Sequence, residues 1–419
     1  MRFLKTVLLL LVVLALAAGA TVAALAFLPT VIPRDVQQAP VVSAWPVATS
    51  ERTVPRPPPT SVGITISVVG DLMTHSPQFP AARTADGSYD FTPAFEPVAS
   101  RISAADLAMG NLETVLGGAD LGYTGYPMFN APDSFAEALA GAGFDVLTTA
   151  NNHALDKGPA AAKRTLDVLD GLGVRHTGTA RSAEERDEVL LIDVNGVSVA
   201  IIAYTYGMNG FRPPADEPWL VNEIDEAAMV ADVKAAAAAG ADVIVACIHN
   251  GLEYQRFPSP SQDRLARAVI DAGADVVFGS HPHVIQPMEV YDVTRADGTV
   301  EQAFIIHSLG NFISNQRPRF TDTGVIVTLA FKKDLRTGLT TLEAVEYVPT
   351  WVDVTAEGRP WWRVLPLGQG GEAEYTDIST DDRTKMRQAW TDTTSHLGGK
   401  PGASEDPAAV VFYTRESAE

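Results

Sequence analysis

The segment GSHPHV, residues 279–284, places His281 and His283 one residue apart, directly after the apolar run ADVVF. Five other apolar runs also end in polar residues: Asp71; Asn111 and Glu113; Asn151, Asn152 and His153; His249 and Asn250; His307 and Asn311. Carboxylate and amide oxygens mixed with imidazole nitrogens suit Mn, Fe or Zn. The single cysteine, Cys247, excludes a cluster of thiolate ligands. The pattern predicts a transition-metal centre.

Each of these residues also has a purely structural explanation. A lone histidine at a strand end, such as His249, is more often hydrogen-bonded than metal-bound. Asp71 after Gly70 can cap a helix or form a turn, and HPH can be a turn in which proline fixes the backbone. The recurrence of such residues after successive apolar runs favours the metal centre over these separate explanations.

The elements that must position these residues alternate between strands and helices. From Ile64 to Ser280, short apolar runs alternate with helical patterns, which predicts a layered α/β domain. Ligands in open α/β folds bind at the carboxyl ends of the strands, where the polar residues stand. The later runs VIQPMEVYDV, QAFIIHSLGN, TGVIVTLAF and LEAVEYVPTWV have no helices between them, which predicts a second sheet.

The composition limits the partners. The formal charge is −20, from 51 acidic and 31 basic residues, which argues against nucleic acid or an anionic membrane surface. A small anionic substrate held by metal remains compatible with this charge. Hydrophobic residues make up 46% of the chain, which is typical of a globular protein with a substantial core.

The N-terminus predicts export. Arg2 and Lys5 precede an uncharged run from Thr6 to Leu28, which is nearer the length of a membrane-spanning helix than of a cleavable signal. We expect a single-pass anchor in the cell membrane with the domain outside the cytoplasm. The sequence Ala18-Gly19-Ala20 offers the alternative of cleavage and secretion.

Four regions are predicted. Residues 1–33 are the anchor or signal peptide, and residues 34–62 are a proline-rich linker. Residues 63–368 form the α/β domain. Residues 369–419 are a polar tail with weak periodicity, in which only one short helix near DDRTKMRQAW is expected.

Six motifs resemble the CapA family of bacterial capsule-synthesis proteins, which is associated with poly-γ-glutamate biosynthesis. They are GDLM (70–73), GNLE (110–113), TANNHALDKG (149–158), HNGLEY (249–254), GSHPHV (279–284) and HSLGNF (307–312). That family looks like a branch of the calcineurin-like metallophosphoesterases. The resemblance implies a four-layer α/β/β/α sandwich around two metals. In this chain the sandwich would follow the N-terminal transmembrane helix that the uncharged run predicts.

The resemblance also implies roles for individual residues. The implied metal ligands are Asp71, Glu113, Asn152, His249, His281 and His283. His153 matches the histidine that faces the leaving group, and Asp156 would orient it. Asn311 and Glu253 would contact substrate. His281 and His283 would then hold one metal each.

Three positions depart from the superfamily pattern. Met73 replaces a histidine of the first motif, so the number of ions is one or two. His75, two residues later, could compensate for that histidine, although a loop role is the simpler reading. The bridging position holds Glu113 instead of aspartate, and the acid after the Asn-His pair is displaced to Asp156.

Two functions follow from this reading. The first is a membrane-anchored, metal-dependent hydrolase of capsule or poly-γ-glutamate biosynthesis, acting on a phosphoester or an anionic polymer. The alternative is a non-catalytic assembly or export component with capsule-synthase subunits as partners. The sequence leaves open whether the chain is an enzyme, because both functions fit the anchor and the linker.

Overall fold

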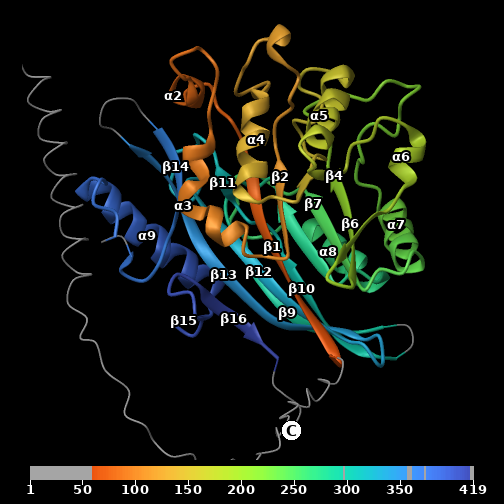
Figure 1. Cartoon of the computed structure of the whole chain (residues 1–419). Helices are drawn as coiled ribbons and strands as arrows, with labels where there is room; N and C mark the ends of the chain where they lie inside the picture. Colours follow the sequence, from red (N-terminus) through yellow and green to blue (C-terminus); the bar gives the residue numbers. More distant parts are fainter. Residues whose placement is uncertain (1–58, 296–297, 356–360, 372–373, 416–419) are drawn as a thin grey trace, which may run out of the picture. The chain divides into compact units, whose positions relative to one another are not determined.

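The computed structural model describes residues 59–415, apart from 296–297, 356–360 and 372–373 (Figure 1). The predicted anchor and almost all of the predicted linker lie outside the described residues. Within those residues, no helix has both the length and the apolar character needed to cross a membrane.

The first sheet has β1 (Ser61–Leu72) at its centre. On one side of β1, three parallel strands follow in order: β2 (Leu107–Leu112), β3 (Val146–Thr148) and β4 (Arg175–Thr177). On the other side, the strands are antiparallel: β12 (Thr323–Asp334), β13 (Thr340–Thr355), β16 (Val410–Thr414) and β15 (Lys400–Pro401). Two strands branch from this order: β11 (Asn311–Ile313) beside β1, and β14 (Trp361–Pro366) beside β13.

The second sheet has six strands in the order β5-β6-β7-β8-β10-β9. The four inner strands are parallel: β6 (Val197–Thr205), β7 (Val243–His249), β8 (Val276–Ser280) and β10 (Val300–Ile306). Each edge strand pairs antiparallel with its neighbour: β5 (Leu190–Val194) with β6, and β9 (Met288–Thr294) with β10.

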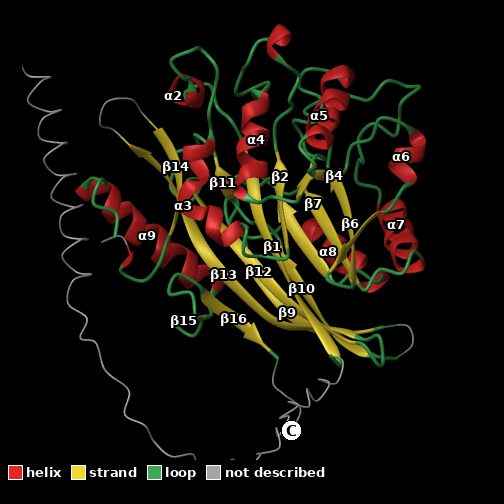
Figure 2. Ribbon diagram, viewed as in Figure 1, coloured by secondary structure: helices red, strands yellow, loops and turns green. Residues whose placement is uncertain are grey.

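Helices lie between strands along the chain, most of them between strands of the parallel parts of the sheets (Figure 2). They are α2 (Gln78–Ala82), α3 (Thr92–Ile102), α4 (Asp133–Ala142), α5 (Pro159–Gly171), α6 (Ala183–Asp187), α7 (Glu226–Ala238), α8 (Pro260–Ala272) and α9 (Thr380–Leu397), with a 3-10 turn at Ala119–Leu121. The sequence sets the bounds of α8. Ser259 and Gln262 form a capping box at its start, and Gly273, with φ of 126°, ends it.

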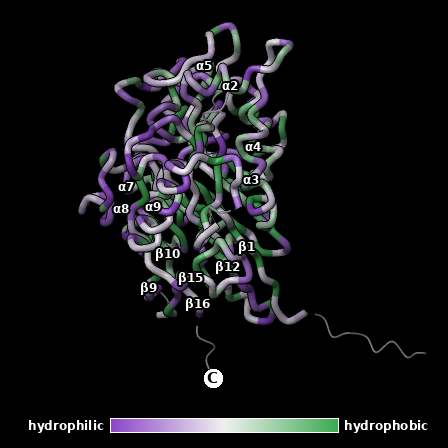
Figure 3. Tube along the Cα trace, turned by 90° about the vertical axis from the view of Figure 1, so that its left-hand side faces the viewer, coloured by the Kyte–Doolittle hydropathy of each residue, from purple (hydrophilic) through white to green (hydrophobic). Residues whose placement is uncertain are grey.

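Three hydrophobic clusters define the layers. One contains inward-facing residues of both sheets, including Val68, Val245 and Val327, and lies between the sheets. A second joins the other face of the first sheet to α3 and α4, and a third joins the other face of the second sheet to α7 and α8. The strands β1 and β12 pass through the hydrophobic part of the trace (Figure 3). The predicted α/β layering is confirmed, with α3, α4, α7 and α8 outside two packed sheets. The helix α9 instead contributes Leu397 to the cluster between the sheets.

Two expectations about the organisation were wrong. The late strands do not form the second sheet by themselves: β12 and β13 extend the first sheet, whereas β9 and β10 extend the second. Each sheet therefore combines a parallel part with antiparallel strands. A helix does form near DDRTKMRQAW, as expected, but α9 is 18 residues long and β16 pairs with β13, so the polar segment after residue 368 is part of the fold. Val410, fully buried in β16, explains this integration.

Candidate metal centre

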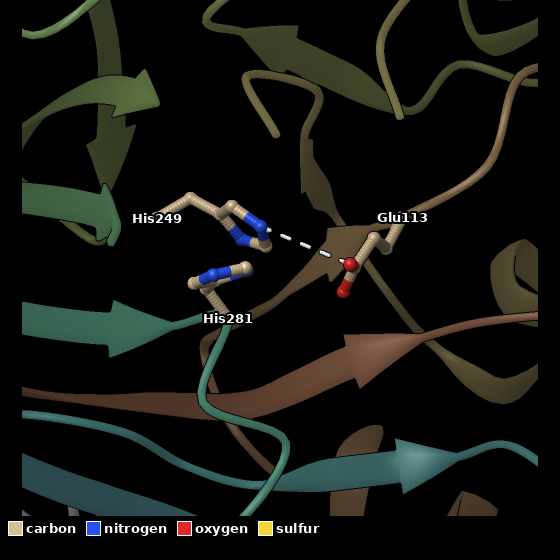
Figure 4. A group of neighbouring side chains, drawn as sticks. All are labelled: Glu113, His249 and His281. Carbon is tan, nitrogen blue, oxygen red and sulfur yellow. Dashed lines mark ion pairs between the residues drawn. The ribbon is translucent and has the colours of Figure 1, made fainter. Parts of the chain in front are cut away.

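The polar residues at and just after the carboxyl ends of β1, β2, β7 and β8 lie close together. Parallel pairing aligns them: Asp71 lies opposite Asn111, and His249 opposite Ser280. Because the two sheets pack face to face, their strand ends bring Glu113, His249 and His281 together (Figure 4). The parallel strand ends therefore build one site from both sheets.

Asp71, Glu113 and His283 form one group of candidate ligands, with ligand atoms within 4.8 Å of one another. Asp71 is fully buried, and its Oδ2 lies 3.0 Å from Nδ1 of His283. The other imidazole nitrogen of His283, Nε2, lies 3.9 Å from Glu113 Oε1. The group thus offers two carboxylates and one imidazole.

Glu113, His249 and His281 form a second group within the same distance. His249 Nε2 lies 3.8 Å from Glu113 Oε1 and 2.8 Å from Asn152 Oδ1. For comparison, two ligand atoms that bind one cation at right angles, each about 2.1 Å from it, would lie about 3 Å apart. Glu113 belongs to both groups, so its carboxylate stands where it could bridge two ions.

Backbone geometry turns both histidines of GSHPHV toward these groups. His281 and His283 have φ of 98° and 59°, the left-handed region that non-glycine residues rarely adopt. Gly279 is equally constrained, because a Cβ there would lie 1.9 Å from the carbonyl oxygen of His307. Strained residues of this kind persist where the surrounding structure holds them, as happens at functional sites.

The residues present fit a cation. Glu113 Oε1 and His281 Nδ1 are buried polar atoms without a hydrogen-bond partner. In the described part of the chain, neither Asp71 nor Glu113 pairs with lysine or arginine; their ion-pair partners are His249 and His283. Two buried carboxylates without a fixed positive charge are costly unless something neutralises them.

Burial also shifts the pKa values of the groups at the site. Burial, followed by the nearby Asp71 charge, raises the pKa of Glu113 well above its usual range. Burial also lowers the pKa of His249 far below 6.5, and lowers that of His281 to about 4. The neighbouring imidazoles strengthen both decreases. Neutral imidazoles keep a nitrogen lone pair available for a metal.

His153 and Asp156 form a buried pair beside the ligands. His153 Nδ1 lies 2.7 Å from Asp156 Oδ2, which also accepts from the Phe129 backbone N–H at 2.5 Å. The rings of Phe129 and His153 meet edge to face, with centroids 4.6 Å apart. Asp156 and Phe129 together fix the orientation of the His153 ring.

The remaining predicted residues surround the centre. Asn311 Oδ1 lies 3.0 Å from His283 Nδ1, so it contacts a candidate ligand from a buried position. The exposed Glu253 forms a further candidate group with His281 and His283. His307 does not join the centre, because it lies beside Asp263 and Glu289 in a separate group.

Three contributors were missed in the sequence. Tyr206, at the end of β6, has its ring centroid 4.6 Å from that of His281 and stacks on His249. Ser280 Oγ lies 2.8 Å from His249 Nδ1, and Phe129 packs on His153. Tyr206 and Ser280 carry the same strand-end signal as the predicted residues. Phe129 lies outside any such run and has no comparable signal.

The comparisons with known proteins agree with the predicted family. The family described as bacterial capsule synthesis protein PGA_cap matches residues 65–316. The capsule biosynthesis protein CapA of Bacillus anthracis is 32% identical over 190 residues, covering 45% of this chain and 44% of that protein. The PGA biosynthesis protein CapA of Bacillus subtilis is 35% identical over 195 residues, covering 46% and 48%. The matches therefore span less than half of these relatives.

Among solved structures, the NAD nucleotidase of Haemophilus influenzae superposes with a TM-score of 0.43 and 13% sequence identity. The superposition covers 79% of this chain and 63% of that protein.

Proposed function

Because this chain belongs to the PGA_cap family of bacterial capsule synthesis proteins, we propose that it is a metal-dependent hydrolase of capsule-polymer synthesis. Its centre would be of the metallophosphoesterase type, with a phosphoester or the poly-γ-glutamate polymer as substrate. The names of the two Bacillus relatives support the link to capsule and PGA biosynthesis.

One observation carries the proposal. Asp71 and Glu113 are both fully buried, share the candidate ligand His283, and have no lysine or arginine partner in the described chain. Glu113 Oε1 and His281 Nδ1 are buried without any hydrogen bond. A divalent cation would satisfy all of these groups at once.

The tautomer of His283 follows from its neighbours. Its Nδ1 lies 3.0 Å from two oxygens, Asp71 Oδ2 and Asn311 Oδ1, so Nδ1 carries the proton that is donated. The lone pair is then on Nε2, which faces Glu113. His283 would therefore bind a metal through Nε2, and Asp71 and Asn311 would hold the ring in place.

A bound divalent cation supplies a water of lowered pKa and neutralises developing negative charge. His153 would donate a proton to the leaving group. Asp156 accepts from Nδ1–H of His153, which leaves Nε2 as the nitrogen that exchanges a proton with substrate. Tyr206 packs on His281 and His249 and so helps to hold both rings.

The site would act outside the cytoplasm. The uncharged run from Thr6 to Leu28 supports a single membrane-spanning anchor, with secretion after cleavage as the alternative. In either case the domain would meet polymer emerging from the cell, together with capsule-synthase subunits. The net charge of −20 would oppose binding of an anionic polymer unless cations mediate the contact.

A second candidate function is a non-catalytic assembly or export component. Met73 favours it, because this buried side chain stands where the superfamily supplies a histidine ligand. None of the candidate ligand groups among the described residues contains His75, so the histidine two residues later does not replace the missing ligand.

The deciding experiment measures metal content by plasma mass spectrometry on the purified full chain, beside Glu113→Ala and His281→Ala. The control is His176→Ala, which removes a half-buried histidine that pairs with Asp170 and belongs to none of the candidate ligand groups among the described residues. We expect one or two ions per chain, lost in the two site variants and retained in the control. Phosphomonoester and phosphodiester probes then test for turnover.

Three outcomes separate the candidates. Two ions with turnover support a dinuclear hydrolase, and one ion means that the position of Met73 provides no ligand. An absence of metal after reconstitution with manganese, iron or zinc contradicts the hydrolase and favours the assembly component. Equal metal loss in the His176→Ala control would refute the location of the centre.

A further inference from the structure

His75 is a half-buried histidine beside the candidate metal centre, and the proposed chemistry leaves it without a role. It lies three residues after β1, and its ring meets Phe129 edge to face with centroids 5.1 Å apart. The ring of Phe129 also meets the ring of His153 edge to face. The ring of Phe129 thus contacts both His75 and His153.

The backbone around His75 is held in place by three contacts. Its N–H donates to Gln78 Oε1 at 2.6 Å, and its carbonyl accepts from the Gln78 N–H at 2.9 Å. The segment at Gly125 packs directly against it, because a Cβ on Gly125 would lie 2.8 Å from the Cα of His75. His75 therefore has little freedom to move its backbone.

One hydrogen bond also determines the tautomer of the ring. The backbone N–H of Asn315 donates to Nδ1 of His75 at 3.2 Å, so Nδ1 must present a lone pair. The side chain of Asn315 is fixed in turn, since its Oδ1 accepts from Nε1–H of Trp362 at 3.2 Å. In the neutral ring, the proton is then on Nε2.

The neutral form is the one present at physiological pH. Burial, together with the nearby His283 and His153, lowers the pKa of His75 to about 4. Nε2–H has no acceptor among the described residues, and the side chain is only partly buried. His75 thus holds one N–H donor that the described chain does not use.

The surroundings need such a donor. The carboxylates at the centre are Asp71, Glu113, Asp156 and Glu253, and no ion pair joins any of them to lysine or arginine within the described ranges. Oxygens of a bound phosphoryl group that do not contact metal would therefore need neutral donors. A directed N–H meets that need without adding a charge to the ligand groups.

We propose that His75 binds the substrate through Nε2–H, donating to a phosphoryl oxygen beside the group that faces His153. This assignment rests on the proposed hydrolase function and gives its site a phosphoryl ligand. It also gives His75 a function distinct from the metal ligand that Met73 replaces. The ring binds substrate while Asn315, Gln78 and Phe129 orient it.

Two substitutions separate substrate binding from a structural role. In His75→Asn, the amide oxygen can still accept from the Asn315 N–H, but no donor reaches the position of Nε2. In His75→Gln, the amide nitrogen reaches that position, because it is three bonds from Cβ, as Nε2 is. A structural role predicts that asparagine substitutes better; substrate binding predicts that glutamine does.

The primary readout is the affinity of the metal-loaded full chain for inorganic phosphate, measured by calorimetry. We expect His75→Asn to weaken binding by about 10- to 100-fold, as for loss of a hydrogen bond to a charged group. His75→Gln should stay within about threefold of wild type. Metal content and the thermal midpoint, measured on the same samples, should be unchanged in both variants.

Other results would overturn the assignment. His75→Asn that binds phosphate as tightly as wild type shows that the donor is not used, and loss of metal in that variant makes His75 a ligand. Metal-loaded wild type that does not bind phosphate also contradicts it. If wild type binds phosphate but hydrolyses no ester, the hydrolase is refuted. The two variants' phosphate affinities then still decide the role of His75.

Discussion

Replacing Glu113 with glutamine should stabilise the metal-free chain. Glu113 is fully buried next to Asp71, and burial with that charge raises its pKa well above the usual 4.5. The folded state therefore holds a proton that the unfolded state releases above pH 4.5. Wild-type stability is fully present below that pH and falls as the pH rises toward the folded pKa. Glutamine removes this dependence.

The expected size follows from one proton per chain. The free energy of unfolding of Glu113→Gln minus that of wild type should increase by about 1.4 kcal/mol per pH unit above 4.5. Between pH 5 and pH 7 this reaches about 3 kcal/mol, provided the folded pKa stays above that window. Because Asp71 and Glu113 interact, the slope belongs to the pair.

The assay is urea unfolding of the full chain in a chelator at several pH values, with the exposed Glu96→Gln of α3 as control. The control should change stability by less than about 0.5 kcal/mol. Added metal should reverse the order at pH 7, since a ligand at 1,000 times its dissociation constant stabilises wild type by about 4.1 kcal/mol, which exceeds the difference of about 3 kcal/mol. A metal-free Glu113→Gln that is less stable than wild type at pH 7 would refute the reasoning.

Three further outcomes are expected. His153→Asn should lower kcat by about 10²- to 10⁴-fold with unchanged metal content, because a proton donor is lost but no ligand; a fall in bound metal would contradict this. Gly279→Ala should destabilise the fold by at least about 1–3 kcal/mol, measured by urea unfolding, because its Cβ would lie 1.9 Å from a backbone oxygen; wild-type stability would speak against the contact. A chain ending at residue 368 loses α9 and β16 and exposes the cluster around Trp351, so soluble yield and thermal midpoint should fall; an equally stable truncated chain would restore the sequence-based boundary.

The sequence predicted which polar residues lie together wherever their local signal matches their position in space. Asp71, Asn152, His249 and His281 each follow an apolar strand, and parallel pairing brings such ends to one edge. The alternation of apolar runs and helical patterns predicted the layers for the same reason. Local patterns were sufficient wherever neighbouring strands follow one another along the chain.

The sequence could not predict pairings between distant segments. β12 could join either sheet by its own pattern, and only its contact with β1 places it in the first. Phe129 lies in a loop, and nothing near it in sequence indicates that it meets His75 and His153. The short run containing Val410 gave no sign that β13 offers it an edge.

The pairing of β1 with β12 has a consequence for how the protein matures. Ser61 lies opposite Asp334, so the strand that carries Asp71 cannot complete its sheet until the chain beyond residue 334 is available. Asp71 and His283, which touch in the folded chain, are 212 positions apart. A growing or partly translocated polypeptide would hold these ligands separately. Cation loading would therefore be a late event, completed in whichever compartment the whole domain folds.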